Sequence, residues 1–276
     1  MARLKPLNDF VFQKLMGERG SEIQLKSFLS AVLGRDLKSI TIFENKNLTP
    51  EIIGDKLSVL DIRATTDDNT HVNIEVQLKI YKHMDIRSLF YWSKIFAAAL
   101  ESGNDYKLLP NVITINILDF EFINSNKYHT IFHLWEDTER HLLTAALEMH
   151  FIEMPKFLSL TNKDFENNGL HRWLMFFNQQ TEENILKELI EMDTAIKKAN
   201  DRLDFLSTDK EFLHYVHLRE IALSDYTTAM NDAKDEGKEK AAIEIAKNLI
   251  KMGLSNSQIS EATGLSETAI KNLNEN

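Results

Sequence analysis

The stretch LSVLDIRATTDDNTHVNIEVQL, residues 57–78, decides the fold because it predicts two short strands joined by a polar turn. We expect the strands over residues 56–65 and 70–80, and the intervening TTDDNT is typical of a hairpin turn. Each strand carries one acid among apolar neighbours, Asp61 in the first and Glu75 in the second. Because burying an unpaired carboxylate is costly, these acids indicate a role beyond core packing.

Strand geometry brings the two acids together. Side chains alternate between the faces of a sheet, so Glu75 and Gln77 share one face. Asp61 lies six residues before Asp67, and Glu75 lies seven after Asp68, so a hairpin turning there sets the acids roughly opposite each other. Converging carboxylates repel unless a positive group separates them, and a hard divalent cation such as Mg²⁺ is one candidate. The alternative is a solvated sheet face on which both acids pair with nearby Arg or Lys side chains.

Composition bounds the class of protein. The chain has 276 residues, is 43% hydrophobic and contains no cysteine, which is compatible with a packed domain in a reducing compartment. The N-terminus MARLKPLNDFVFQKL lacks the apolar core of a signal peptide, and no apolar run is long enough to cross a bilayer. We therefore expect a cytoplasmic protein without membrane association.

The net charge of −10 opposes nucleic-acid binding at first sight, but its distribution is uneven. Residues 1–125 hold 15 basic and 16 acidic side chains, a net of −1, whereas residues 126–276 hold 17 and 26, a net of −9. The balanced first half is therefore compatible with a local basic groove.

Hydrophobic periodicity predicts the remaining order of elements. The expected elements are helices at 8–18 and 21–34, a strand at 38–45, the opening hairpin, a helix at 82–103, a central strand at 111–120, two strands in KYHTIFHLWE and ALEMHFIEM, and helices from about residue 165 onward. The pattern predicts an α/β fold, a mixed sheet flanked by helices and followed by a helical C-terminal extension. We divide it into 1–165, a helical extension at 166–252, and a small helix-turn-helix-like tail at 253–276.

A set of spaced motifs points to a known family. LNDFVFQKLMGE, LDIRA, NIEVQL and DIRSLFYWSKIFAAALESGNDYKLLPNVITINILDFEF follow one another along the first half of the chain. Residues 4–123 thereby resemble the recombination-promoting nuclease / putative transposase family of the PD-(D/E)XK nuclease superfamily. The resemblance implies a restriction-endonuclease-like sheet and a metal-dependent DNA endonuclease, linked to recombination or transposase-like activity. It also implies that Asp61 and Glu75 are metal ligands, for Mg²⁺ or another divalent cation.

One position departs from the wider superfamily, in which a lysine usually stands two residues after the glutamate. Here Gln77 occupies it, and glutamine supplies no positive charge and is a poor general base. Lys79 or Arg87 could approach the scissile phosphate instead. The superfamily often adds a further acid from the first helix, and the candidates are Asp9, Glu18 and Glu22.

Helix 82–103 and the tail offer candidate DNA contacts. The aromatic cluster SLFYWSKIF is expected mainly to pack on the sheet, while Arg87, Tyr91 and Lys94 share one helix face and could contact the DNA backbone. The tail has helix-turn-helix spacing with Gly264 in the turn, but its second helix carries one cation, Lys271, so a packing or self-association module is the other option. The helical second half could also form a homodimer.

Two other functions stay open from the sequence. One is a non-catalytic DNA- or protein-binding module on the nuclease fold, which Gln77 and the acidic charge favour. The other is the same nuclease activity used in defence against phage.

Overall fold

The computed structural model describes residues 3–43, 62–80, 82–101 and 103–274. The chain divides into two compact units, Met1–His217 and Leu218–Asn276, and the helix α9 (Lys210–Lys251) contributes residues to both. The proposed division at residues 165 and 252 stays a prediction.

The first unit is built on a mixed six-stranded sheet with the order β1-β2-β3-β4-β6-β5. The central strands β3, β4 and β6 run parallel, and the remaining neighbours pair antiparallel. The strands are β1 (Ile40–Phe43), β2 (Ile62–Thr66), β3 (His71–Gln77), β4 (Val112–Leu118), β5 (His129–Trp135) and β6 (Leu142–Glu153). Because β4 is covered on both faces, all seven of its residues are buried, which confirms the predicted central strand.

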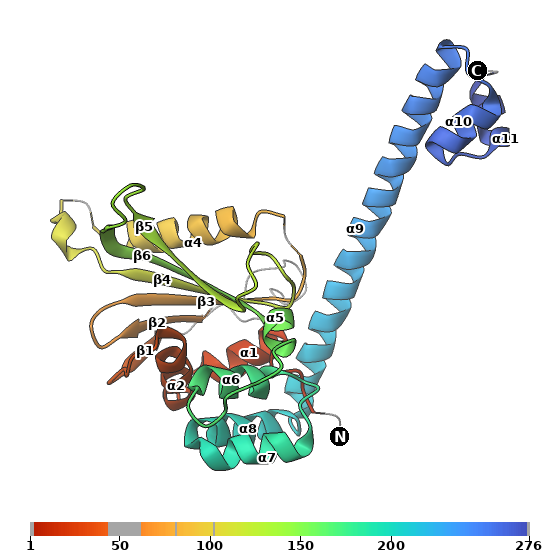
Figure 1. Cartoon of the computed structure of the whole chain (residues 1–276). Coiled ribbons are helices and arrows are strands. Elements are labelled where there is room, and N and C mark those ends of the chain that lie inside the picture. Colours follow the sequence, from red (N-terminus) through yellow and green to blue (C-terminus); the bar gives the residue numbers. More distant parts are fainter. Residues whose placement is uncertain (1–2, 44–61, 81, 102, 275–276) are drawn as a thin grey trace. The chain divides into compact units, whose positions relative to one another are not determined.

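Helices cover both faces of the sheet, with α4 on one face and α1, α2 and α6 on the other (Figure 1). The helices of this unit are α1 (Asp9–Met16), α2 (Glu22–Leu33), α4 (Met84–Ala98), α5 (Met154–Leu158), α6 (Gly169–Phe177), α7 (Glu183–Met192) and α8 (Thr194–Leu206), with a short 3₁₀ turn η1 (Tyr106–Leu108). The predicted α/β fold with flanking helices is confirmed.

Local signals explain where the first two helices begin and end. Asn8 precedes α1, and its side chain accepts the N–H groups of Phe10 and Val11. Helix α2 ends at Gly34, whose φ of 63° is the left-handed conformation that glycine tolerates best. Ser21 precedes α2, and its side chain makes no capping hydrogen bond there.

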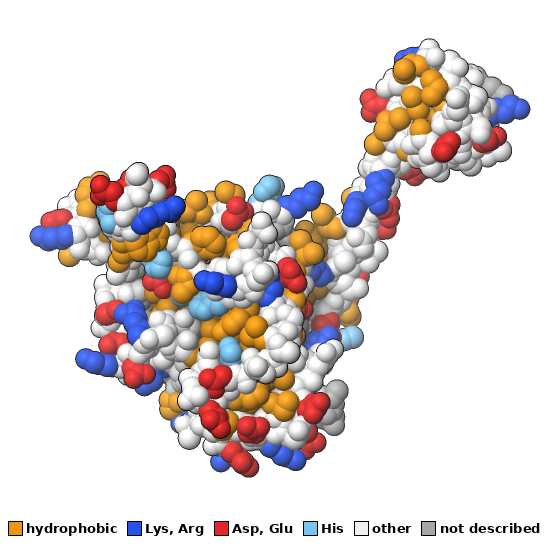
Figure 2. All heavy atoms as spheres, in the orientation of Figure 1, with side chains coloured by type: hydrophobic (Ala, Val, Ile, Leu, Met, Phe, Trp, Pro, Cys, Tyr) orange, Lys and Arg blue, Asp and Glu red, His pale blue; other side chains and the backbone are white. Residues whose placement is uncertain are grey.

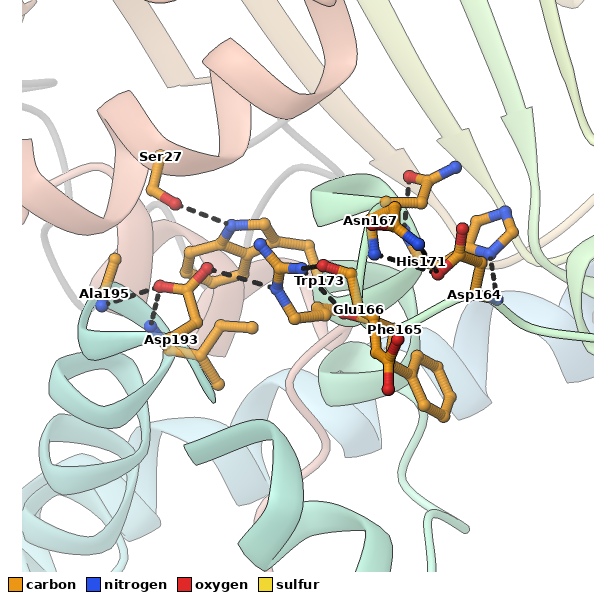
Figure 3. A network of polar contacts seen from close by, with 12 residues as sticks. Ser27, Asp164, Phe165, Glu166, Asn167, His171, Trp173, Asp193 and Ala195 are labelled. Carbon is orange, nitrogen blue, oxygen red and sulfur yellow. Dashed lines mark hydrogen bonds and ion pairs between the residues drawn. The ribbon is translucent and has the colours of Figure 1, made fainter. Parts of the chain in front are cut away.

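The main core lies between the sheet and α1, α2 and α6. Trp173 and three phenylalanines, Phe12, Phe28 and Phe177, are almost fully buried and meet mostly edge to face. The indole N–H of Trp173 donates to Ser27 Oγ at 3.1 Å, which satisfies the one polar atom of this side chain (Figure 3). This cluster ties α2 to α6, and both helices contribute side chains to the same core as the sheet.

The opening hairpin has the predicted turn. Asp68 accepts the hydroxyl of Thr66 and the N–H of Thr70, and Asn69 takes a φ of 62°, a conformation that asparagine tolerates. Beyond the turn, Ile62 of β2 lies opposite Ile74 of β3. Asp61 lies outside the described residues.

The second unit contains the end of α9 with α10 (Asn256–Thr263) and α11 (Glu267–Asn274). Gly264 adopts a φ of 75° between the two short helices, and Ile259 and Ile270 are completely buried against Ala246. The predicted helix-turn-helix packing is confirmed. In the described part of the chain, no helix is long and apolar enough to cross a membrane.

Candidate functional site

The face of β3 that looks toward α4 carries a buried row of polar side chains, Asn73, Glu75 and Gln77, which are 1%, 2% and 8% exposed. Asn73 Nδ2 lies 3.4 Å from Glu75 Oε1, and Gln77 Nε2 lies 3.5 Å from Glu75 Oε2. Both contacts are at the long limit for hydrogen bonds. The carboxylate is therefore buried but only loosely held by its strand neighbours.

A cation from α4 completes the surroundings of this carboxylate. Arg87 Nε lies 3.6 Å from Glu75 Oε2, and the Arg87 guanidinium lies 5.1 Å from the centre of the Tyr91 ring. The guanidinium thus has a carboxylate on one side and an aromatic face within cation–π range. Arg87 therefore lies beside the carboxylate of Glu75, and its contact with a scissile phosphate stays a prediction.

Polar contacts between α4 and β4 hold the helix in this position. Ser88, which is 1% exposed, lies 3.1 Å from the hydroxyl of Thr114 and accepts a 2.9 Å hydrogen bond from Asn116 Nδ2. Asn116 is the β4 residue paired with Glu75, and it also donates to the carbonyl of His150. These contacts of Ser88 therefore hold α4 against β4 at the residue next to Arg87.

Some of the oxygen atoms in this polar row are suitable ligands for a hard cation. Glu75 offers carboxylate oxygens, and Asn73 Oδ1 is a buried amide oxygen without a hydrogen-bond partner among the described residues. Oxygen ligands of this kind are those that Mg²⁺ prefers. No cluster of three or more His, Asp or Glu side chains suited to a metal occurs within the described ranges, and Asp61 is outside them.

The other predicted site residues are distributed around this row. Lys79 comes after Leu78, beyond the end of β3, and is half-buried, and Tyr91 and Lys94 line a hollow beside β1–β3. Glu18 pairs with Lys14 and Arg202.

The two remaining acid candidates hold backbone groups. Asp9 accepts the N–H of Phe10, and Glu22 accepts that of Gly20 at 2.8 Å. The choice among Asp9, Glu18 and Glu22 therefore stays a prediction.

The opposite face of the sheet carries a second polar cluster that the sequence did not reveal. His129 Nε2 lies 2.8 Å from His150 Nδ1, and His150 Nε2 lies 2.6 Å from Glu148 Oε1. His133 Nε2 lies 3.4 Å from the other oxygen of Glu148. Burial, together with the neighbouring His150, lowers the pKa of His129 to about 4.

The spacing of His129 and His133 was visible in the sequence, but their partners lie on β6. Only the antiparallel register of β5 and β6, which sets Ile131 opposite His150 and His133 opposite Glu148, brings the four together. Alternation within KYHTIFHLWE and ALEMHFIEM is the one signal that could have placed them on a shared face.

Sequence comparison now identifies the class of protein. The PD-(D/E)XK nuclease family transposase model matches residues 6–233, and the Rpn/YhgA-like nuclease family C-terminal HTH domain matches residues 239–275. The chain therefore belongs to the PD-(D/E)XK nuclease family of transposases and carries the helix-turn-helix domain of Rpn/YhgA-like nucleases. No curated protein and no solved structure matches it significantly.

Membership of this nuclease family confirms the resemblance drawn from the sequence motifs. It also indicates the kind of chemistry to which the polar row on β3 could contribute. These families point to a nuclease-like hydrolase that interacts with DNA, since helix-turn-helix domains are DNA-binding modules. PD-(D/E)XK nucleases generally use divalent metal ions.

Proposed function

We propose that this protein is a Mg²⁺-dependent DNA endonuclease that hydrolyses phosphodiester bonds in recombination or transposase-like processes. The observation that carries the proposal is the buried Glu75, flanked by two amide side chains and an arginine on one sheet face. Burying this carboxylate beside Asn73 Oδ1, a buried amide oxygen without a partner among the described residues, is costly for folding, and a bound cation would offset that cost.

Asp61 and Glu75 are the proposed metal ligands. The proposal requires Asp61 to lie opposite Glu75. The antiparallel pairing of Ile62 with Ile74 is compatible with this, because one more residue in the same register would pair Asp61 with Glu75. Asn73, which the sequence did not single out, could add its amide oxygen. A cation held there activates water and neutralises phosphate charge when bound.

The remaining roles follow from position. Gln77 would hold a water by hydrogen bonding, because its amide cannot supply charge. Arg87, 3.6 Å from Glu75, would contact the scissile phosphate and take over the charge that lysine supplies elsewhere in the superfamily. Lys79, Tyr91 and Lys94 would contact the DNA beside it.

The distribution of charge supports DNA on the α4 side of the sheet. Figure 2 shows acidic side chains gathered over the α7–α8 part of the first unit, which is a poor surface for a polyanion. Arg87 and Lys94 come from α4, on the opposite side of the sheet from α1, α2 and α6. A homodimer, which light scattering would detect, would allow two such sites to cut both strands.

The test is nicking of supercoiled plasmid with Mg²⁺. We expect Asp61→Ala and Glu75→Gln to lose at least about 100-fold in rate, because each removes a proposed ligand. Asp137→Ala, which removes an exposed aspartate from the β5–β6 turn, is the matched control and should cut like the parent. Nicking by Asp61→Ala at the parent rate would remove Asp61 from the mechanism.

A charge exchange tests the role of Arg87. Arg87→Gln should lose activity, and the double variant Gln77→Lys/Arg87→Gln should recover part of it, because lysine restores a cation next to Glu75. Absence of any recovery, with both proteins folded, would show that a cation at this place is insufficient.

The non-catalytic alternative is favoured by two features of the sequence, the glutamine at position 77 in place of lysine and the net charge of −10. It predicts DNA binding without Mg²⁺-dependent cleavage. Calorimetric titration of Mg²⁺ into the parent and into Glu75→Gln distinguishes the two, since a binding protein of this kind would show no heat that depends on Glu75. A role in phage defence would use the same cleavage chemistry.

A further inference from the structure

A hollow of about 470 Å³ lies between α4 and the part of the sheet formed by β1, β2 and β3. Its walls include Phe43, Arg63 and His71 from the three strands, and Tyr91 and Lys94 from α4. Its volume is within the range of ligand pockets, roughly 300–1,000 Å³. The hollow is thus large enough for a small organic group.

The strand register places the hollow on the same face as the candidate nuclease site. Phe43 pairs with Arg63, and Arg63 pairs with Asn73, so all three lie on the face that carries Glu75. His71 precedes Glu75 by four residues on β3, which corresponds to about 13 Å along the strand. A few nucleotides of one DNA strand span this distance, since phosphates follow one another every ~3.4 Å along a stacked strand.

The chemistry of the walls is unusual for a chain with a net charge of −10. The described lining residues include two cations, Arg63 and Lys94, and no acid. Three of them carry rings, and Phe43 is 52% exposed although it is a large apolar side chain. Its ring lies 6.2 Å from that of His71, in an edge-on arrangement. Aromatic rings beside cations are the combination that binds unstacked bases and their phosphates.

We propose that this hollow binds one unstacked nucleotide of single-stranded DNA, with its base among Phe43, His71 and Tyr91 and its phosphate near Arg63 and Lys94. A base can enter such a hollow only after leaving the stack of the duplex. The substrate class of the nuclease is therefore DNA with a single-stranded or frayed segment next to the cut. This inference rests on the proposed function for its biological meaning, but the binding itself can be measured without cleavage.

Tyr91 connects the hollow to the candidate nuclease site. Its ring lines the hollow and lies 5.1 Å from the Arg87 guanidinium, which in turn lies 3.6 Å from Glu75. A base stacked on Tyr91 would restrict the ring and, through it, the arginine. Occupation of the hollow would then position Arg87 for the phosphate two or more nucleotides away.

The experiment is fluorescence anisotropy of a labelled 20-nucleotide strand and of the matching duplex, at one fixed salt concentration and with EDTA to prevent cleavage. We expect Phe43→Ala to weaken single-strand binding about 10-fold and duplex binding by less than about 2-fold, because base–aromatic stacking is lost only in the single strand. Tyr106→Ala is the matched control, since Tyr106 is 80% exposed on η1 and lies outside the hollow. Tyr91→Phe, which keeps the ring, should bind like the parent, and Tyr91→Ala should not.

The outcomes separate the two proposals. Equal losses of single-strand and duplex binding in Phe43→Ala, or no loss in either, would overturn the nucleotide pocket. Complete competition by a free deoxynucleoside monophosphate at micromolar concentration would also overturn it, in favour of a mononucleotide ligand. Ring-dependent single-strand binding in a protein that never nicks plasmid with Mg²⁺ would instead refute the proposed function and leave the pocket standing.

Discussion

The half-buried imidazole of His129 is expected to make the first unit sensitive to mild acid. In the folded chain its pKa is lowered to about 4, mainly by burial and then by His150, whereas an exposed histidine titrates near 6.5. A depressed imidazole pKa means that the unfolded state binds the proton more readily. The contribution of neutral His129 to the free energy of unfolding is therefore fully present above about pH 6.5, and it is lost as the pH falls from there toward 4.

The magnitude follows from the two pKa values. Between pH 7 and pH 5, protonation of His129 in the unfolded chain lowers the free energy of unfolding by about 2 kcal/mol. The pKa of Glu148 is lowered, chiefly by its hydrogen bond with His150, so its contribution is lost only at more acidic pH than this window. The pKa of the adjoining Tyr128 is raised by burial, so it titrates far above the window.

Urea unfolding at pH 7 and pH 5 measures this effect. The three tryptophans, Trp92, Trp135 and Trp173, all lie in the first unit, so their fluorescence follows that unit. In His129→Gln the difference in unfolding free energy between pH 7 and pH 5 should shrink by about 2 kcal/mol, because glutamine does not titrate. His141→Gln, which removes an exposed histidine, should leave the difference unchanged. The same pH dependence in the parent and in His129→Gln would refute the reasoning.

Three further substitutions test the packing of the first unit, each by urea unfolding at pH 7 against the parent. Trp173→Ala should lower the unfolding free energy by about 3–5 kcal/mol, because it empties the centre of the aromatic cluster; a loss below about 1 kcal/mol would mean that the core closes over the space. Lys156→Met should cost about 3–5 kcal/mol, because it leaves the fully buried Glu153 without the ammonium group 2.8 Å away; an unchanged midpoint would contradict this. Asn8→Ala should cost about 1 kcal/mol through the lost cap of α1, and Asn8→Asp should retain most of the stability.

Local signals in the sequence were sufficient for the elements and for one pairing. The turn around Asp68 predicts the hairpin register, because a turn fixes which residues of adjoining strands face each other. Gly34 and Gly264 stand where α2 and α10 end in the left-handed conformation. The nearly all-apolar sequence of β4, which includes Thr114 and Asn116, predicts a strand covered on both faces.

Contacts between distant elements required the structure. Asn116 meets Ser88 only because β4 and α4 are packed face to face, and no periodicity encodes which turn of the helix meets which strand residue. The hollow beneath Tyr91 depends in the same way on the distance between α4 and β1–β3. Sequence patterns report which side of an element is buried, but not the partner that buries it.

The two buried polar groups on opposite faces of the sheet differ in how their hydrogen bonds are satisfied. In the histidine cluster, both ring nitrogens of His150 have close partners at 2.6 and 2.8 Å, so the group stabilises itself. In the row around Glu75, its contacts with Asn73, Gln77 and Arg87 lie between 3.4 and 3.6 Å, and Asn73 Oδ1 has no partner among the described residues. A cation bound at the face toward α4, as the proposed function requires, would satisfy Asn73 Oδ1, whereas the histidine cluster already has close partners within the protein.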